Sequence, residues 1–300
     1  MYIFLKAWIK DTFLYYFIRN AYRFIGVLSG SYSFNLLLSD IESQLSRNRI
    51  RFFQSLYVNF RSLNFKDAIK IPIVTYSNLN IQSLQGRILF KDCVVQPMMI
   101  ELGVFQRYRS QGVTRINNKG QIIFHGKGKI LRGAELMTYP DAIIEFGDSF
   151  FVGENVMIYA AEHISMGKSS RISYHSQICD SDFHFMINIE NGTIKNRTKP
   201  IFIGDFNWIA NNVTIKKGTR TPDHITAAGS YTVLLKDYTK EVPPYSILAG
   251  NPARCLCTGY SRIWKNEKQR IFELAKFFKD NPLEIIYKIK PNECYCDYSF

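Results

Sequence analysis

Apolar residues recur every six positions through the middle of this chain. They fall in five triples with a fixed internal spacing of six, and the only polar member is Thr221. The fifteen positions are Phe124, Ile130, Leu136, Phe146, Val152, Ile158, Met166, Ile172, Ile178, Ile203, Ile209, Ile215, Thr221, Ala227 and Val233. A period of six matches neither a helix, which repeats every 3.6 residues, nor a two-faced strand. It is typical of a parallel β-helix, in which each unit is one short strand and one corner.

This period predicts how the chain packs. Three units form one triangular coil of about 18 residues, and coils stack at strand spacing, about 4.8 Å. One side chain per unit points to the axis, so several coils are needed to bury it. Gly147, Gly153, Gly167 and Gly204 each follow an inward residue, which predicts corners with unusual backbone dihedrals. An ordinary β-rich domain with chance spacing is the alternative.

Composition and charge narrow the classes of partner. The chain has 300 residues, enough for one large domain or two small ones, and 15% of them are aromatic, so it is not a disordered chain. Its net charge of +13 favours anionic partners such as phosphate-bearing cofactors, nucleotide-linked substrates or an anionic membrane surface. We expect no nucleic-acid partner, because no nucleic-acid-binding module is recognisable. A solvated basic face would also account for the charge.

The cysteines indicate a reducing compartment. No apolar signal-peptide core precedes them, so we expect a cytoplasmic protein with free thiols. The C-x-C pairs are closer than the usual spacing of structural zinc ligands, and we therefore expect no metal. The six are Cys93, Cys179, Cys255, Cys257, Cys294 and Cys296.

Three segments are predicted. Residues 1–56 form a basic, aromatic-rich helical arm, 57–257 the β-helix with a long loop at 179–200, and 258–300 a C-terminal helix (262–290) and tail. Residues 1–30 have no uninterrupted apolar run long enough to span a bilayer. They are interpreted as a helix packed on the body or on a neighbouring subunit, or as an amphipathic helix at the inner face of the cell membrane, with packing favoured.

The long loop contains the first candidate for catalysis. His184 lies in the segment CDSDFHF, and imidazole is the side chain best suited to take a proton near neutral pH. Asp180 or Asp182 could hydrogen-bond its second ring nitrogen. A solvent-facing loop histidine with flanking acids is the alternative, and Cys179, next to inward Ile178, is interpreted as a packing residue.

A motif-level resemblance makes this loop more specific. Asp180-Ser181-Asp182-Phe183-His184 matches a D-x-D-x-H loop, and it precedes Pro200-Ile201-Phe202-Ile203-Gly204-Asp205. Together with IFIGDFNWIANNVTIKKGT and the ending VPPYSILAGNPARCL, these motifs resemble the hexapeptide-repeat acyltransferases. The resemblance covers roughly 60–257 and is greatest to the branch that acetylates sugars and xenobiotics, especially the acetyltransferases of bacterial surface polysaccharides.

The resemblance implies an all-β core built as a left-handed parallel β-helix with a triangular cross-section. It further implies a homotrimer with active sites between neighbouring prisms, acetyl-CoA as the acyl donor, and His184 as the general base of direct transfer. The cofactor contacts that it implies are Trp208, Asn211, Ala228, Gly229, either Lys236 or Lys240, and Arg254. Ala210, in place of the usual glycine, and the segment HITAAGS depart from the family pattern.

The acceptor side is less specific. Tyr174 and His175 stand beside inward positions and are candidates for the acceptor site, with His175 as the rival base. The expected acceptor is a carbohydrate hydroxyl, nucleotide-linked, lipid-linked or in an oligosaccharide, and an amino sugar is a close variant. Two other functions compete: a zinc hydratase, disfavoured because the five histidines lack a close pair, and a non-catalytic trimeric scaffold.

Overall fold

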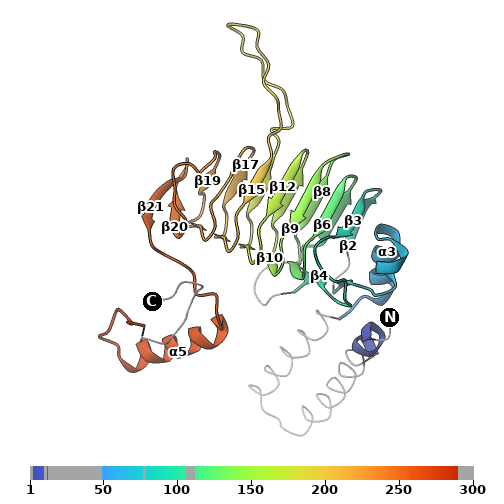
Figure 1. The fold of residues 1–300 in the computed structure, drawn as a ribbon, viewed down its shortest axis with the longest axis horizontal. Coiled ribbons are helices and arrows are strands. Elements are labelled where there is room, and N and C mark those ends of the chain that lie inside the picture. Colours follow the sequence, from blue (N-terminus) through green and yellow to red (C-terminus); the bar gives the residue numbers. More distant parts are fainter. Residues whose placement is uncertain (1–2, 10–11, 13–48, 77–78, 106–111, 290–300) are drawn as a thin grey trace, which may run out of the picture.

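A computed structural model describes residues 3–9, 12, 49–76, 79–105 and 112–289, and their strands form a parallel β-helix (Figure 1). Sheet A contains β1 (Ile73–Thr75), β4 (Ile100–Val104), β7 (Gly128–Leu131), β10 (Phe150–Val152), β13 (Arg171–Ile172), β16 (Trp208–Ile209), β18 (Thr226–Ala227), β20 (Ser246–Ala249) and β21 (Arg254–Thr258). Sheet B contains β2 (Leu79–Leu84), β5 (Thr114–Asn118), β8 (Glu135–Thr138), β11 (Met157–Ala160), β14 (Gln177–Cys179), β17 (Thr214–Lys216) and β19 (Val233–Leu234). Sheet C contains β3 (Arg87–Phe90), β6 (Gln121–Phe124), β9 (Ile143–Phe146), β12 (His163–Met166) and β15 (Ile201–Ile203).

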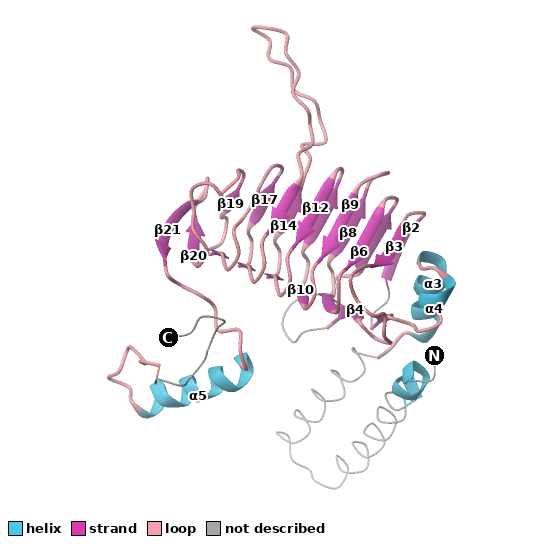
Figure 2. Ribbon diagram, in the orientation of Figure 1, coloured by secondary structure: helices cyan, strands magenta, loops and turns pink. Residues whose placement is uncertain are grey.

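The chain visits the three sheets in turn, so each circuit is one coil of a triangular prism. Neighbouring strands are parallel except β20 and β21, which close the C-terminal end as an antiparallel pair. Figure 2 shows short strands joined by tight corners along the whole prism. The predicted fold class is confirmed.

The six-residue period marks the core. All the predicted inward side chains from Phe124 to Ala227 are buried. They stack on their equivalents from coil to coil, as in the column Ile130, Val152, Ile172, Ile209 and Ala227.

The last predicted inward residue is wrong by one position. Leu234, not Val233, is fully buried and pairs with Ile215. The corner that precedes β19 contains Gly229 at φ +84°, and it is one residue longer than the repeat. Because facing alternates along a strand, this single insertion exchanges the inward and outward positions.

The glycines that follow inward residues have a different role from the one predicted. None of the four has a positive φ; an added Cβ at Gly147 would instead lie 2.4 Å from the Lys168 nitrogen of the next coil. At Gly204 it would lie 2.6 Å from the Pro222 oxygen. Close approach between coils therefore requires glycine here. The left-handed residue is the second one after each glycine: Ser149, Asn155, Ser169 and Phe206.

Helices close the N-terminal end. α3 (Phe52–Ser62) and α4 (Phe65–Ala68) precede the first strand, so the predicted boundary between 56 and 57 falls inside α3. Residues 3–9 are helical and pack on this end, with Phe4 fully buried and its ring 5.4 Å from that of Phe52. Packing on the body is therefore confirmed for residues 3–9, and most of the predicted arm lies outside the described residues.

The C-terminal helix is shorter than predicted. α5 spans Glu267–Asp280 and ends before Asn281 and Pro282. A proline disfavours helical backbone in the residue before it, which explains the early end. Ile271 and Phe272 on α5 are 53% and 76% exposed. Within the described ranges, no helix combines the length and hydropathy needed to cross a bilayer.

Candidate active site

One corner of the prism brings together most of the predicted cofactor and acceptor residues. We call it the AB edge: residues 173–176, 210–213 and 228–232, which join sheet A to sheet B in three successive coils, together with the adjacent 250–253 turn between β20 and β21. Backbone hydrogen bonds hold these corners in line, from Asn212 N to Tyr174 O at 3.2 Å and from Tyr231 N to Asn212 O at 2.9 Å. One edge therefore carries Tyr174, His175, Asn211, Ala228 and Gly229.

The AB edge is open in front of Gly229. A Cβ added there would meet only Thr232 Oγ1, at 3.9 Å. The backbone N–H of Gly229 and that of Ser230 donate to no described residue, while the side chain of Asn211 donates to Ser230 Oγ at 3.1 Å. An extended, amide-containing chain could therefore approach this backbone and accept its hydrogen bonds, which is the chemistry that a pantetheine arm requires.

Trp208 lies beside the AB edge, and Arg262, which the sequence did not indicate, lies over its ring. Its indole N–H donates to Ser173 Oγ at 3.2 Å, and the guanidinium of Arg262 lies 5.0 Å from the ring centroid. Arg262 comes from the segment after β21 and also forms an ion pair with Glu267 at the start of α5. The ring is therefore held in place on one side by the C-terminal segment. No motif in the sequence marked Arg262 for this role.

The basic residues that the resemblance assigns to the cofactor are divided between two places. Arg254 is exposed and follows the Gly250–Ala253 corner of the AB edge. Lys236 and Lys240 follow β19, at the end of that strand away from the AB edge. There, isolated backbone β-bridges join Asp237 to Arg220 and Arg220 to Phe202 of β15. Lys236 forms an ion pair with Glu241, and Lys240 is exposed. Within one chain, these two lysines are not part of the AB edge.

The predicted active-site loop leaves the prism at the opposite edge of sheet B. Residues 181–198 form an antiparallel arm, with bridges between Ser181 and Thr198 and between Ile187 and Ile194, and it projects away from the prism (Figure 1). Several apolar side chains on the arm are exposed, among them Ile189 (90%) and Met186 (74%). Exposed apolar side chains gathered on one segment are typical of a contact surface.

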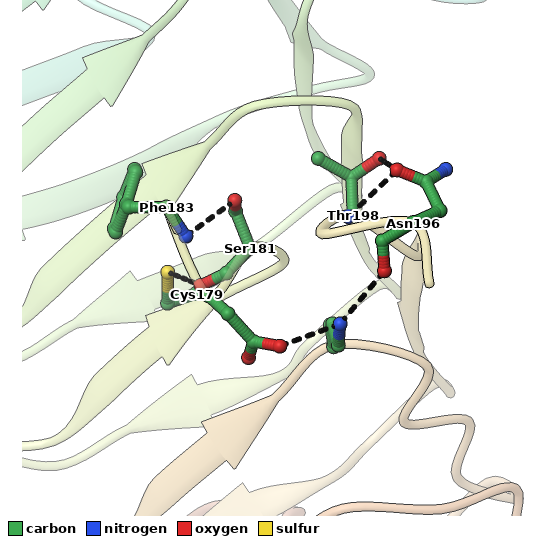
Figure 3. A network of polar contacts seen from close by, with 7 residues as sticks. Cys179, Ser181, Phe183, Asn196 and Thr198 are labelled. Atoms are coloured by element: carbon green, nitrogen blue, oxygen red, sulfur yellow. Dashed lines mark hydrogen bonds and ion pairs between the residues drawn. The ribbon is translucent and has the colours of Figure 1, made fainter. Parts of the chain in front are cut away.

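Polar contacts fix the base of the arm (Figure 3). Phe183 N donates to Ser181 Oγ at 2.9 Å, and Lys217 Nζ donates to Asn196 O at 3.0 Å. Lys217 also pairs with Asp182 Oδ2 at 2.6 Å, so it joins both strands of the arm to the corner after β17. Lys217 was not predicted, because nothing in the sequence around it indicates this contact.

Asp180 anchors the arm to the prism. Its buried carboxylate accepts hydrogen bonds from Ala161 N at 2.7 Å and Glu162 N at 2.9 Å. Burial raises the pKa of Asp180, while hydrogen bonds from the backbone N–H groups of residues 161–163 act to lower that pKa. Asp180 therefore binds the backbone of the preceding coil, and it is not bonded to His184 as the sequence analysis suggested for one of the two acids.

We expect Asp180→Ala to lower the free energy of unfolding by about 2 kcal/mol, because buried backbone N–H groups lose their acceptor. The measurement is urea-induced unfolding followed by circular dichroism. Asp182→Ala is the matched control: its carboxylate is half exposed and forms one ion pair, so the loss should stay within about 1 kcal/mol. Equal losses in the two variants would contradict the anchoring role of Asp180.

His184 itself is exposed on the arm and hydrogen-bonds to no described residue. Asp182, the other predicted orienting group, is paired with Lys217. His184 is therefore available to groups outside its own chain. On this single chain the AB edge and the arm lie at opposite ends of the sheet B strands, separated by roughly 10 Å of extended backbone.

Other reactive side chains, Cys179, His125 and His163, contact neighbouring residues of the prism. Cys179 donates to Ser181 O at 3.0 Å, and burial raises the pKa of its thiol, which makes it a poor nucleophile at neutral pH. His125 contacts Asp92, and His163 contacts Glu145 at 3.4 Å. Among the described residues, no group of three or more His, Cys, Asp and Glu side chains is arranged to hold a metal ion.

Comparison with known proteins places this geometry in context. The colanic acid biosynthesis acetyltransferase WcaF of Escherichia coli is 29% identical over 133 residues, covering 43% of this chain and 65% of that protein. The polysialic acid O-acetyltransferase of Neisseria meningitidis is 38% identical over 55 residues, covering 18% of this chain and 26% of that protein. The predicted resemblance is confirmed.

The extent of this similarity is partial. The match spans just under two thirds of WcaF, the 65% given above. A solved structure of the polysialic acid O-acetyltransferase OatWY matches 68% of this chain and 85% of its own, with 22% identity and a TM-score of 0.34. No family model matches the chain.

Proposed function

We propose that this protein is an acetyl-CoA-dependent O-acetyltransferase that acetylates a sugar hydroxyl of a surface polysaccharide or its precursor. The observation that carries the proposal is the AB edge, where Asn211, Ala228 and Gly229 lie in register beside an open backbone. The similarity in sequence to the two named acetyltransferases supports the same activity. We assign the role of general base to His184.

The complete site requires more than one copy of the chain. His184 and the AB edge lie at opposite ends of sheet B, and the exposed apolar side chains of the arm need a surface to contact. An arm that crossed to the AB edge of a second copy would bury those side chains and bring an imidazole to the open backbone. We propose a homotrimer, in which each copy gives its arm to one neighbour and receives an arm from the other.

Each group then has a defined task. When bound, acetyl-CoA supplies an activated acetyl thioester. The edge backbone at Gly229 and Ser230 would hold the pantetheine arm in an extended form, and Arg254 would pair with its phosphates. Tyr174 and His175 lie on the coil before Asn211 and would face the acceptor sugar. The His184 ring would take the proton from the attacking hydroxyl and then give it to the CoA thiolate that leaves, so that the neutral imidazole is regenerated.

The test is acetyl-CoA turnover by the purified protein against a panel of nucleotide sugars and polysaccharide fragments, with CoA release and the mass of the product as readouts. Acetylation of a sugar hydroxyl is expected. Zero turnover together with no measurable CoA binding would contradict the proposal. The trimer has its own readout, because light scattering should give three times the chain mass of 34.9 kDa.

A second prediction probes the edge directly. Gly229→Val is expected to weaken CoA binding about tenfold or more, because the branched side chain fills the open space beside the backbone. Calorimetric titration with CoA measures the change. Gly259→Val is the matched control: Gly259 also has a left-handed φ (+81°) and open surroundings, but it lies outside the AB edge. Equal weakening in both variants would show that the backbone strain, rather than the edge, is responsible.

A further inference from the structure

The α3 helix, which closes the N-terminal end of the prism, buries a mainly polar face. Its buried face carries Ser55, Asn59 and Ser62 together with Val58. A helix at the surface of a globular protein normally turns its apolar face to the core. On α3 the polar face is inside.

The free edge of the first coil explains this inversion. β1 and β2 each end a sheet, so their outer backbone groups have no neighbouring strand. Asn59 supplies both missing partners of Ile73, donating to its oxygen at 2.7 Å and accepting from its nitrogen at 3.1 Å. Ser55 Oγ accepts from Thr75 N at 3.0 Å. The polar face of α3 therefore replaces the strand that is absent beyond the first coil.

The consequence is an aromatic surface that faces away from the protein. Phe53, Tyr57 and Phe60 are 82%, 54% and 44% exposed, and their i, i+4, i+7 spacing places them on one face of α3. Phe65 of α4 is 73% exposed, and its ring lies 6.2 Å from that of Phe60. We call these four residues the aromatic cap face.

Positive charge surrounds this face. Arg51, Arg61 and Lys66 are exposed, and none forms an ion pair with a carboxylate in the part of the chain that the structure describes. α3 contains no acidic residue, and Asp67 of α4 already accepts a hydrogen bond from Asn64 Nδ2 at 2.8 Å. Exposed aromatic rings with unpaired cations beside them are the combination by which helices bind the surface of an anionic bilayer.

We propose that the aromatic cap face docks on an anionic membrane surface, with the rings among the headgroups and the cations paired with lipid phosphates. The charges favour this occupant over a second copy, because two identical cap faces would bring Arg51, Arg61 and Lys66 against the same cations. This contact goes beyond the proposed acetyl transfer, because it gives α3 and α4 an interaction surface of their own. It is distinct from the segment 1–30 that the sequence indicated.

The experiment is flotation of the full-length protein with vesicles of phosphatidylcholine alone or with about 30% phosphatidylglycerol. The protein should bind the anionic vesicles about tenfold more strongly than the neutral ones. Phe53→Ala/Phe65→Ala and, separately, Arg61→Glu/Lys66→Glu should each reduce that binding about tenfold. The control pair is Leu283→Ala/Ile286→Ala, which removes similarly exposed apolar side chains (95% and 72%) near the C-terminus and should bind as the parent does.

Three outcomes would overturn the proposal. The first is the absence of binding to either vesicle, which would mean that the chain itself covers the face. The second is unchanged binding in both variants, which would place the lipid contact elsewhere. The third is a lower mass by light scattering for Phe53→Ala/Phe65→Ala without vesicles, which would identify a second copy as the occupant. Turnover of a soluble acceptor should be unchanged in these variants, so failure here is distinguishable from failure of the proposed acetyl transfer.

Discussion

His184→Ala should reduce acetyl transfer by a factor on the order of 100 or more while leaving stability and CoA affinity unchanged. The loss follows from removing the group that takes the proton of the attacking hydroxyl. Stability should be unaffected because the ring is exposed and hydrogen-bonds to no described residue of its own chain. The measurements are CoA release with a responsive acceptor, CoA titration and thermal unfolding.

His125→Ala provides the matched control, because that imidazole contacts Asp92 on an early coil and is remote from the AB edge in sequence and fold. It should retain the parent rate. Unchanged transfer in His184→Ala would remove His184 from its role as base. Unchanged transfer in both variants would leave the AB edge as a cofactor site that needs a different base.

The same variant tests whether the site is shared between copies. Mixing His184→Ala chains with Gly229→Val chains, followed by reassembly, should raise the rate at subsaturating acetyl-CoA above the rate of either variant alone. In a mixed assembly, an intact arm from one copy meets an intact edge from another. This increase requires that arrangement, because a site contained in one chain stays defective in every mixed assembly.

The second large effect is expected in the core. Phe146→Ala should lower the free energy of unfolding by about 3–5 kcal/mol. Phe146 is fully buried, and its ring lies 5.4 Å from that of Phe124 and 4.4 Å from that of Phe150. Because the rings of neighbouring coils touch, the coils cannot collapse fully into the space that the truncation leaves. Denaturant unfolding measures the loss.

Phe272→Ala is the control for this prediction, since the same side chain on α5 is 76% exposed and its removal should change stability by less than about 0.5 kcal/mol. A loss of similar size in the two variants would contradict the assignment of the side chains at the six-residue repeat to the core. A loss below about 1 kcal/mol in Phe146→Ala would do the same.

Much of the candidate site was predictable because it depends on backbone register. Once the coils stack in a fixed repeat, corners separated by one circuit must lie on one edge, so Tyr174, Asn211 and Gly229 come together without any specific side-chain contact. The roles of Asp180 and Trp208 were not predictable in this way. Their partners, the 161–163 corner and Arg262, lie at sequence distances that the repeat does not fix.

The sequence alone determined the parallel β-helix, because a buried side chain at every sixth position is a requirement of each coil and therefore appears in every coil. It also located the long excursion at 179–200, since a break in the repeat is visible where the chain leaves it. Only the tertiary structure decided that Leu234 replaces Val233 in the core, that glycines serve contact between coils, and that α3 turns its polar face inward. The first depends on how a longer corner is accommodated, the second on the adjacent coil, and the third on an unpaired strand edge. Local patterns of apolar and polar residues do not record these spatial relations.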